Sequence, residues 1–260
     1  MKNRNYRSAI VLCGGMSRRM GEDKGSMVIK KKPMIIHLLE TLNNQIDETI
    51  IVLNNSERIA KYKTIIQNYY KNSKGDFSYD LVFLEDELKN QGPLSGILTG
   101  LENISSNYSL VLPCDSPFVD KNFINFMFDC LNKLIATNFS KNSSKNNHPL
   151  HDLDFDKNSL GNIDAIVPYY YKDEESKKYN NFKYNTNFFL NNENEQIKNF
   201  LLNNSEPLHS IYRKNNSNKI KKLLNSDILD LKSFLKSINS YFIFINDKNT
   251  FKNINTKEDI

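Results

Sequence analysis

Short apolar runs alternate with segments of helical periodicity through the first half of the chain. Four runs of aliphatic and β-branched residues are each followed within two residues by glycine, asparagine or an acidic residue, which is typical of buried parallel strands. These runs are residues 8–13, 49–53, 79–84 and 108–113. Apolar positions at helical spacing follow each run, over residues 33–42, 57–70, 92–102 and 122–136. Such alternation predicts parallel βαβ crossovers, and therefore an α/β fold with a doubly wound, mainly parallel sheet flanked by helices.

The second half of the chain has weaker patterns. Strand character returns at residues 165–171, 207–212 and 241–245, and helices are predicted over residues 194–204 and 219–237. No internal repeat is visible.

Three polar stretches interrupt the predicted elements. They lie near residues 72–78, 138–162 and 172–192, and the second is a low-complexity run of Asn, Ser, Lys, His and Asp. Such segments offer little apolar surface to bury. We expect a single domain over residues 1–260, in which these stretches are flexible surface insertions.

Composition narrows the classes of partner. The 260 residues carry a formal net charge of +5, which is mild and spread along the chain. This charge suits an anionic small molecule and gives no argument for nucleic acid. The three cysteines form no CxxC pair, which favours buried free thiols in a reducing cytosol over a disulfide framework or a zinc site. The first apolar run is too short for a signal peptide or a membrane span, so we expect a cytoplasmic protein without a membrane partner.

The strongest chemical signal follows the first predicted strand, in the sequence LCGGMSRRMGEDK at residues 12–24. The paired glycines Gly14 and Gly15 leave backbone N–H groups that can approach phosphate oxygens without a side-chain clash. Arg18, Arg19 and Lys24 follow in the same loop and can neutralise a polyphosphate. The alternative is a glycine turn with surface cations, which the clustering of the cations disfavours. The spacing matches neither a Walker A loop nor a dinucleotide fingerprint.

Polar residues also follow the other predicted strands. Asp115 comes just after the fourth strand, where ligands of open parallel sheets collect, and its carboxylate can hold Mg²⁺ against a triphosphate. A helix N-cap before Pro117 is the alternative role for Asp115. Asn54 follows the second strand, and its amide can contact a base edge or a ribose, although asparagine is also a common turn residue.

Several motifs of the chain resemble those of a known family. The loop at residues 12–24 is similar to the signature loop of the molybdenum cofactor guanylyltransferases, within the GT-A-like nucleotidyltransferases. Further motifs of that family match in collinear order along most of the chain. They are KPM at 32–34, ED at 85–86 with QGPLSGI at 91–97, LPCDSPF at 112–118, EPLH at 206–209 and NINTKED at 253–259. The resemblance implies a Rossmann-like sheet of the nucleotide-diphospho-sugar transferase type.

The resemblance also implies roles for individual residues. The catalytic residues that it implies are Lys24, Arg19 and Asp115, and it implies that Asp115 holds Mg²⁺. The nucleotide site that it implies comprises Leu12, Cys13, Gly14, Gly15, Arg18, Lys24, Asn54, Asp86 and Asp115. The acceptor site that it implies comprises Pro93, His209, Asn253 and Asn255. A solvated turn acid remains the alternative for Asp86, a packed strand residue for His209, and an Asn-rich loop for Asn253 and Asn255.

The reaction implied is an in-line displacement. The terminal phosphate of molybdopterin attacks the α-phosphorus of GTP, giving molybdopterin guanine dinucleotide and pyrophosphate. An ionised phosphate needs no strong general base, so the protein supplies positioning and charge neutralisation. The expected partners are GTP and molybdopterin, with contact to other molybdenum cofactor biosynthesis proteins, in a monomer or weak oligomer. Three alternatives stay open: a CTP-dependent molybdopterin cytidylyltransferase, a sugar- or alcohol-phosphate nucleotidyltransferase, and a non-catalytic nucleotide-binding module.

Overall fold

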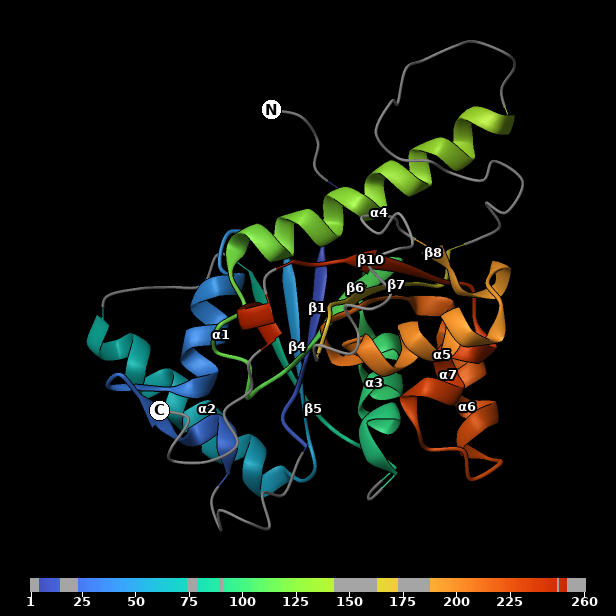
Figure 1. Ribbon diagram of the computed structural model, residues 1–260. Helices are drawn as coiled ribbons and strands as arrows, with labels where there is room; N and C mark the ends of the chain where they lie inside the picture. The colour runs from blue at the N-terminus through green and yellow to red at the C-terminus, as the bar shows by residue number, and fades with distance from the viewer. Residues whose placement is uncertain are drawn as a thin grey trace.

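A computed structural model of the chain has an eight-stranded sheet at its centre, in the order β5-β4-β1-β6-β9-β7-β10-β8 (Figure 1). It describes residues 5–14, 23–73, 79–88, 91–142, 163–172, 188–246 and 248–251. The strands are β1 (Ser8–Leu12), β4 (Glu48–Leu53), β5 (Asp80–Glu85), β6 (Tyr108–Pro113), β7 (Ala165–Tyr169), β8 (Phe188–Phe189), β9 (Ile211–Arg213) and β10 (Ser240–Phe244). The helices are α1 (Met34–Leu42), α2 (Ser56–Ser73), α3 (Gly92–Asn103), α4 (Lys121–Asn142), α5 (Glu195–Asn204), α6 (Ser217–Leu224) and α7 (Leu231–Ser237).

The sheet is mainly parallel. Strand β1 pairs in parallel with β4 and β6, β4 pairs in parallel with β5, and β7 pairs in parallel with β10. Only two short strands run the other way among the described residues: β9 is antiparallel to β6 and β7, and β8 is antiparallel to β10. The predicted doubly wound α/β fold is confirmed.

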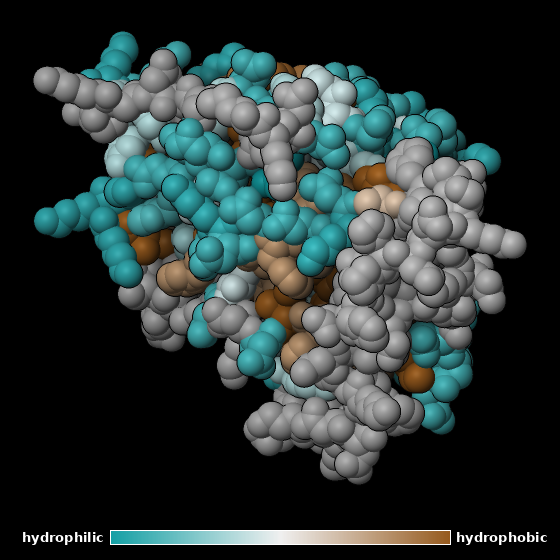
Figure 2. Space-filling model, turned by 90° about the horizontal axis from the view of Figure 1, so that it is seen from above, coloured by the Kyte–Doolittle hydropathy of each residue, from teal (hydrophilic) through white to brown (hydrophobic). Residues whose placement is uncertain are grey.

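Helices cover both faces of the sheet, as Figure 1 shows. Residues of α1, α2 and α4 pack with Ala9 and Val11 in one apolar core, and residues of α3, α5, α6 and α7 pack with Ile10 and Val52 in the other. Successive residues of β1 thus point into different cores, and Ala9, Ile10 and Val11 are all 0% exposed. This burial on both faces is why the parallel strands read as continuous apolar runs. On the face in Figure 2, hydrophobic side chains of the described residues are confined to small patches among hydrophilic ones.

The observed elements differ from the predicted ones in several places. Helix α2 continues to Ser73, into the first polar stretch, and residues 74–78 lie outside the described part of the chain. Helix α4 continues to Asn142, into the stretch expected to be an insertion, while residues 143–162 lie outside the described part of the chain. Of residues 172–192, Phe188–Phe189 form β8 and Leu190–Asn192 form a 3-10 helix, and residues 173–187 lie outside the described part. The strand expected at 207–212 begins only at Ile211, because Pro207 lacks an N–H and His209 N donates to Glu206 O at 2.9 Å in a 3-10 turn.

A small hairpin after the first loop was not predicted. Strand β2 (Val28–Ile29) pairs antiparallel with β3 (Lys32–Pro33), and the two turn residues, Lys30 and Lys31, have φ of 46° and 69°. Two-residue hairpins of this kind usually carry asparagine and glycine, which tolerate positive φ. Lysines at both positions removed the sequence signal for the turn.

Close packing of α3 on the sheet depends on Gly100. A Cβ added there would lie 2.6–2.7 Å from three side-chain atoms of Ile10, which is fully buried in β1 and branched at its own Cβ. We expect Gly100→Ala to lower the free energy of unfolding by about 1–3 kcal/mol through overpacking, although alanine favours a helix over glycine by roughly 1 kcal/mol. Denaturant unfolding measures the change. The control is Glu102→Ala at an exposed position of the same helix, and a Gly100→Ala protein as stable as that control would contradict the prediction.

Candidate functional site

Four neighbouring strands deliver polar residues to one edge of the sheet. Backbone hydrogen bonds extend the ladder just past the strand ends: Cys13 N donates to Val52 O at 2.9 Å, Cys114 N to Leu12 O at 3.0 Å, and Asp86 N to Leu53 O at 2.7 Å. Residues that follow β1, β4, β5 and β6 are therefore held side by side. Because all four strands are parallel, their carboxyl ends meet there, and this is where ligands of open α/β sheets bind.

Lys24 and Asp115 form an ion pair at this edge. Lys24 Nζ lies 2.8 Å from Asp115 Oδ2, and the two side chains are 21% and 15% exposed. Lys24 begins the 3-10 helix Lys24–Ser26, at the end of the glycine-rich loop, and Asp115 lies two residues after β6. A cation and an acid from two distant segments thus share one partly sheltered position, where charges interact more strongly than in bulk water.

Gly14 and Asn54 are also in close contact. A Cβ added at Gly14 would lie 2.9 Å from Asn54 Oδ1, so the side chain of Asn54 occupies the space next to the bare Cα. The absence of a side chain at Gly14 leaves its backbone accessible to a ligand and lets the two strand ends approach.

Asp86 is held by the start of α3. Its Oδ2 accepts a hydrogen bond from Ser95 Oγ at 2.7 Å, and its Oδ1 accepts one from Leu88 N at 3.2 Å. Burial raises the pKa of Asp86, and the hydrogen bonds from Ser95 and Leu88 act in the opposite direction. The structure therefore gives this acid a half-buried, hydrogen-bonded setting and not that of a solvated turn. Pro93 lies in the first turn of the same helix.

The two thiols at the strand ends meet beneath the site. Cys13 and Cys114 are both buried and free, as is expected for a reduced pair, and Cys130 is free and half-buried. Burial raises the pKa of Cys13, as does its hydrogen bond with Cys114. Gly25 fits against the same cluster, since a Cβ there would lie 3.1 Å from Cys114 Sγ and 2.3 Å from the hydroxyl of Tyr62. The start of the 3-10 helix that carries Lys24 is thus packed directly on the thiol pair.

His209 lies under the site and not on its surface. Its side chain is fully buried, and its Nε2 is 2.9 Å from Ser116 Oγ, next to Asp115 in the chain. Phe251 covers the ring edge-on, with centroids 5.2 Å apart. A direct contact between His209 and an acceptor would need an exposure that this side chain does not have. In this geometry its ring contacts Ser116.

The buried His209 makes stability depend on pH. Burial, and to a lesser degree Lys172, lowers the pKa of His209 from 6.5 to about 3. Between these values the unfolded chain binds a proton that the folded protein does not, so stability must fall as the pH falls. We expect His209→Gln to flatten the dependence of the unfolding free energy on pH between about 6.5 and 4, measured by urea denaturation. An unchanged slope would contradict this, because the acidic residues are common to both proteins.

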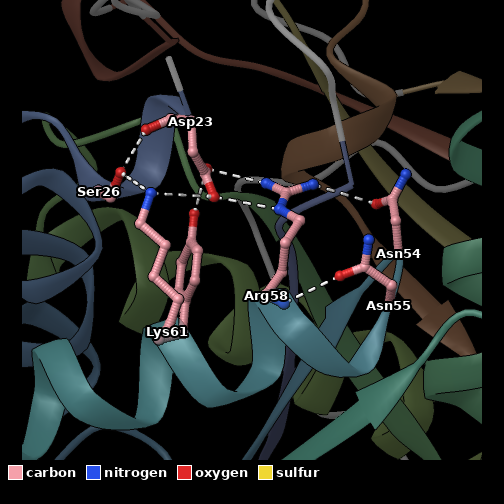
Figure 3. Close-up of polar contacts among 7 residues, drawn as sticks. Asp23, Ser26, Asn54, Asn55, Arg58 and Lys61 are labelled. Atoms are coloured by element: carbon pink, nitrogen blue, oxygen red, sulfur yellow. Dashed lines mark hydrogen bonds and ion pairs between the residues drawn. The ribbon is translucent and has the colours of Figure 1, made fainter.

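Arg58 and Asp23 were not singled out from the sequence, yet they form a polar cluster at this edge. Figure 3 shows Arg58, on the first turn of α2, reaching both Asp23 and Asn54. The Asp23 carboxylate also accepts a hydrogen bond from the Tyr62 hydroxyl at 2.6 Å. Asp23 precedes Lys24 in the glycine-rich loop, and this position alone weakly indicated a role in the site. Arg58 had none, because it occupies an ordinary polar position of a predicted helix.

Several expected site residues lie outside the described part of the chain. They are Gly15, Arg18, Arg19, Asn253 and Asn255. Of the others, Leu12, Cys13, Gly14, Lys24, Asn54, Asp86 and Asp115 gather at the same sheet edge. Within the described ranges, no group of three or more His, Cys, Asp or Glu residues is arranged to hold a metal ion. No described helix is both long and apolar enough to span a membrane.

Comparison with known proteins gives concordant family matches. The family described as "MobA-like NTP transferase domain" matches residues 9–235. A "Probable molybdenum cofactor guanylyltransferase" of Methanothermobacter thermautotrophicus is 35% identical over 127 residues, which are 49% of this chain and 59% of that protein. A "Molybdenum cofactor guanylyltransferase" of Histophilus somni is 33% identical over 148 residues, 56% of this chain and 68% of that protein. The aligned part thus spans little more than half of the first relative.

Solved structures share the fold at low identity. Molybdopterin-guanine dinucleotide biosynthesis protein A from Archaeoglobus fulgidus superposes with a TM-score of 0.56 at 17% identity, covering 97% of this chain and 94% of that one. A CMP:2-keto-3-deoxy-manno-octonic acid synthetase complexed with CTP superposes with a TM-score of 0.59 at 11% identity, again covering 97% and 94%. These structures show the fold alone. Because the family match extends over residues 9–235, this chain belongs to the MobA-like NTP transferase domain family.

Proposed function

We propose that this protein transfers GMP from GTP to the terminal phosphate of molybdopterin, forming molybdopterin guanine dinucleotide and releasing pyrophosphate. The observation that carries the proposal is the Lys24–Asp115 ion pair of 2.8 Å, beside Gly14 at the carboxyl edge of the parallel strands. The names of its relatives favour GTP and molybdopterin as substrates.

We propose Mg²⁺ as the metal of the reaction. Mg²⁺ in phosphoryl-transfer sites is usually held by one or two carboxylates, with phosphate oxygens and water completing its shell. Asp115, 15% exposed at the sheet edge, supplies such a carboxylate, so the residues present fit this ion. When bound, the metal would neutralise charge on the phosphate oxygens.

The residues of the chain then have distinct tasks. The backbone N–H groups of Gly14 and Gly15 bind phosphate oxygens. Leu12 and Cys13 form the strand end that holds these glycines, since Cys13 N is already bonded to Val52 O. Asn54 and Asp86 contact the base or ribose. Lys24 stabilises the negative charge that builds up on the α-phosphoryl group, and Arg18 or Arg19 holds the departing pyrophosphate. The attacking phosphate is already ionised, so no residue needs to remove a proton from it.

The acceptor is bound by a second set of residues in this proposal. Pro93, Asn253 and Asn255 contact the pterin, whose donor and acceptor edges suit amide side chains. His209 acts indirectly: its hydrogen bond with Ser116, which is 2.9 Å long, holds the residue next to Asp115 in place.

We further propose that residues 1–260 form a single domain with polar insertions near 72–78, 138–162 and 172–192. Strand β1, near one end of the chain, and strand β10, near the other, belong to the same eight-stranded sheet, which supports a single domain. We propose that the protein works in the cytoplasm.

A direct assay tests the proposed activity. The protein is incubated with molybdopterin, Mg²⁺ and either GTP or CTP, and pyrophosphate release and the dinucleotide product are measured. We expect turnover with GTP. Turnover with CTP alone would identify a cytidylyltransferase, and tight GTP binding without pyrophosphate release would identify a non-catalytic module.

A further inference from the structure

Arg58 bridges two segments that meet at the proposed nucleotide site. Its Nε donates to Asp23 Oδ2 at 3.1 Å, and a terminal nitrogen lies 2.8 Å from Asp23 Oδ1. Its other terminal nitrogen donates to Asn54 Oδ1 at 3.3 Å, so one guanidinium contacts both side chains (Figure 3). The side chains of Arg58 and Asp23 are only 15% and 12% exposed. In such a sheltered position, the planar guanidinium holds its partners in fixed directions.

This contact determines which way the Asn54 amide faces. A guanidinium has only donors, so the atom of Asn54 that faces Arg58 must be the carbonyl oxygen. The Nδ2 group then points away from Arg58, as Figure 3 shows. Gly14 adds a second constraint, because its Cα lies beside the same oxygen and a Cβ there would come within 2.9 Å of it. Arg58 and Gly14 thus contact the Oδ1 atom of Asn54 from two sides. The Nδ2 group of Asn54 remains as its hydrogen-bond donor toward a ligand.

The same network fixes the backbone that precedes Lys24. Asp23 O accepts hydrogen bonds from Ser26 N at 3.0 Å and from Ser26 Oγ at 2.8 Å. Lys61 Nζ donates to Ser26 Oγ at 2.9 Å and lies 4.0 Å from Asp23 Oδ2. Arg58 and Lys61 therefore surround the Asp23 carboxylate, which leaves the neighbouring Lys24 to pair with Asp115.

We propose that Arg58 is a positioning residue that turns Asn54 so that its Nδ2 group donates a hydrogen bond to an acceptor atom of the bound nucleotide. Suitable acceptors are a base carbonyl oxygen, a ring nitrogen or a ribose oxygen. This inference rests on the proposed function only in that the site takes a nucleoside triphosphate. It does not depend on which base is bound or on what receives the nucleotidyl group.

The first test compares two neighbouring asparagines. Asn54→Asp keeps an oxygen towards Arg58 but replaces the donor group with a second oxygen. Asn55→Asp is the matched control: it adds the same charge one residue away, and its carboxylate can still accept the hydrogen bond from Arg58 N that Asn55 Oδ1 accepts at 2.9 Å. We expect Asn54→Asp to raise the Kd for the nucleotide by about tenfold or more, and Asn55→Asp to change it by less than about threefold.

The second test asks whether Arg58 acts through Asn54. Arg58→Lys keeps a positive charge for Asp23, but an ammonium cannot hold Asp23 and Asn54 in the same fork. We expect Arg58→Lys to raise the Kd by roughly threefold to tenfold. In the double variant Arg58→Lys/Asn54→Asp, the Kd should equal that of Asn54→Asp alone, because the orientation that Arg58 sets is no longer useful. A purely structural role of Arg58 would make the two effects multiply.

Titration calorimetry with GTP and Mg²⁺, and with CTP and Mg²⁺, supplies the Kd values, and the nucleotide that the unmodified protein binds more tightly is used throughout. Equal Kd values for Asn54→Asp and Asn55→Asp would overturn the inference, as would multiplying effects in the double variant. If the protein prefers CTP, the proposed substrate is wrong, while the comparison of variants still decides the role of Arg58. If the unmodified protein binds neither nucleotide, both proposals fail. Should Arg58→Lys not fold, as thermal unfolding would reveal, Arg58→Gln takes its place in the single- and double-variant comparison.

Discussion

Replacing Asp115 with asparagine is expected to lower turnover about a thousandfold or more, while the Kd for GTP stays within about tenfold of its original value. Asparagine has almost the same shape and can still accept a hydrogen bond from Lys24, whose Nζ lies 2.8 Å from the carboxylate. Only the negative charge is lost, and with it the proposed anchor for Mg²⁺. Since that charge matters most when the α-phosphoryl group reacts, the effect should fall on turnover. Asp115→Ala should lower turnover at least as far.

The measurement is pyrophosphate release at saturating Mg²⁺ and GTP, with the Kd determined separately by calorimetry. The matched control is Asp120→Asn, an exposed acid whose Oδ1 accepts a hydrogen bond from Phe123 N at 2.8 Å at the start of α4. Asparagine caps a helix about as well as aspartate, so this control should turn over normally. Near-normal turnover of Asp115→Asn would show that the assigned role of Asp115 is wrong.

Replacing Lys24 with glutamine is expected to lower turnover by roughly a hundredfold to a thousandfold. Its side chain is 21% exposed and starts from the 3-10 helix Lys24–Ser26, so its charge acts from a sheltered and oriented position. Glutamine preserves much of the length of the side chain but removes the charge. Because Lys24 and Asp115 contact each other, the effects of Lys24→Gln and Asp115→Asn should not be additive.

The control for this variant is Lys221→Gln, which breaks an ion pair with Glu102 on the exposed surface of α3 and α6. Exposed pairs of this kind contribute about 0–1 kcal/mol to stability, so neither turnover nor folding should change noticeably. If Lys24→Gln retained full turnover, or if its effect simply multiplied with that of Asp115→Asn, Lys24 would not act at the reacting centre as proposed.

The sheet was predictable because its strands are covered on both faces. Ile10 and Val11 point to opposite cores and are both 0% exposed, which makes β1 an unbroken apolar run. Strands β8 and β9 were harder to predict, because two or three residues are too short to show a period. Strand β9 lies between β6 and β7, so its place in the sheet follows from neighbours far away in the chain.

The candidate site was predictable only where chemistry is local. The glycine pair and the cations after it lie in the loop that follows β1, and Asp115 lies just after β6. Each of these features can be recognised within one short segment of the sequence. The partners of these residues are not local: Lys24 and Asp115 are 91 residues apart, Arg58 and Asp23 are 35 apart, and His209 and Ser116 are 93 apart. Periodicity reveals which face a residue occupies but not which side chain it meets.

The alternation of strands and helices, the polar residues after each strand and the family motifs can all be recognised in the amino-acid sequence alone. Only the folded structure reveals that Lys24 pairs with Asp115, that Arg58 contacts the Asn54 amide oxygen, and that His209 is buried next to Ser116. The physical reason is that local propensity and hydrophobic period are properties of a short segment. Hydrogen-bond partners, burial and shifted pKa values arise only when distant segments are brought within a few ångströms of each other.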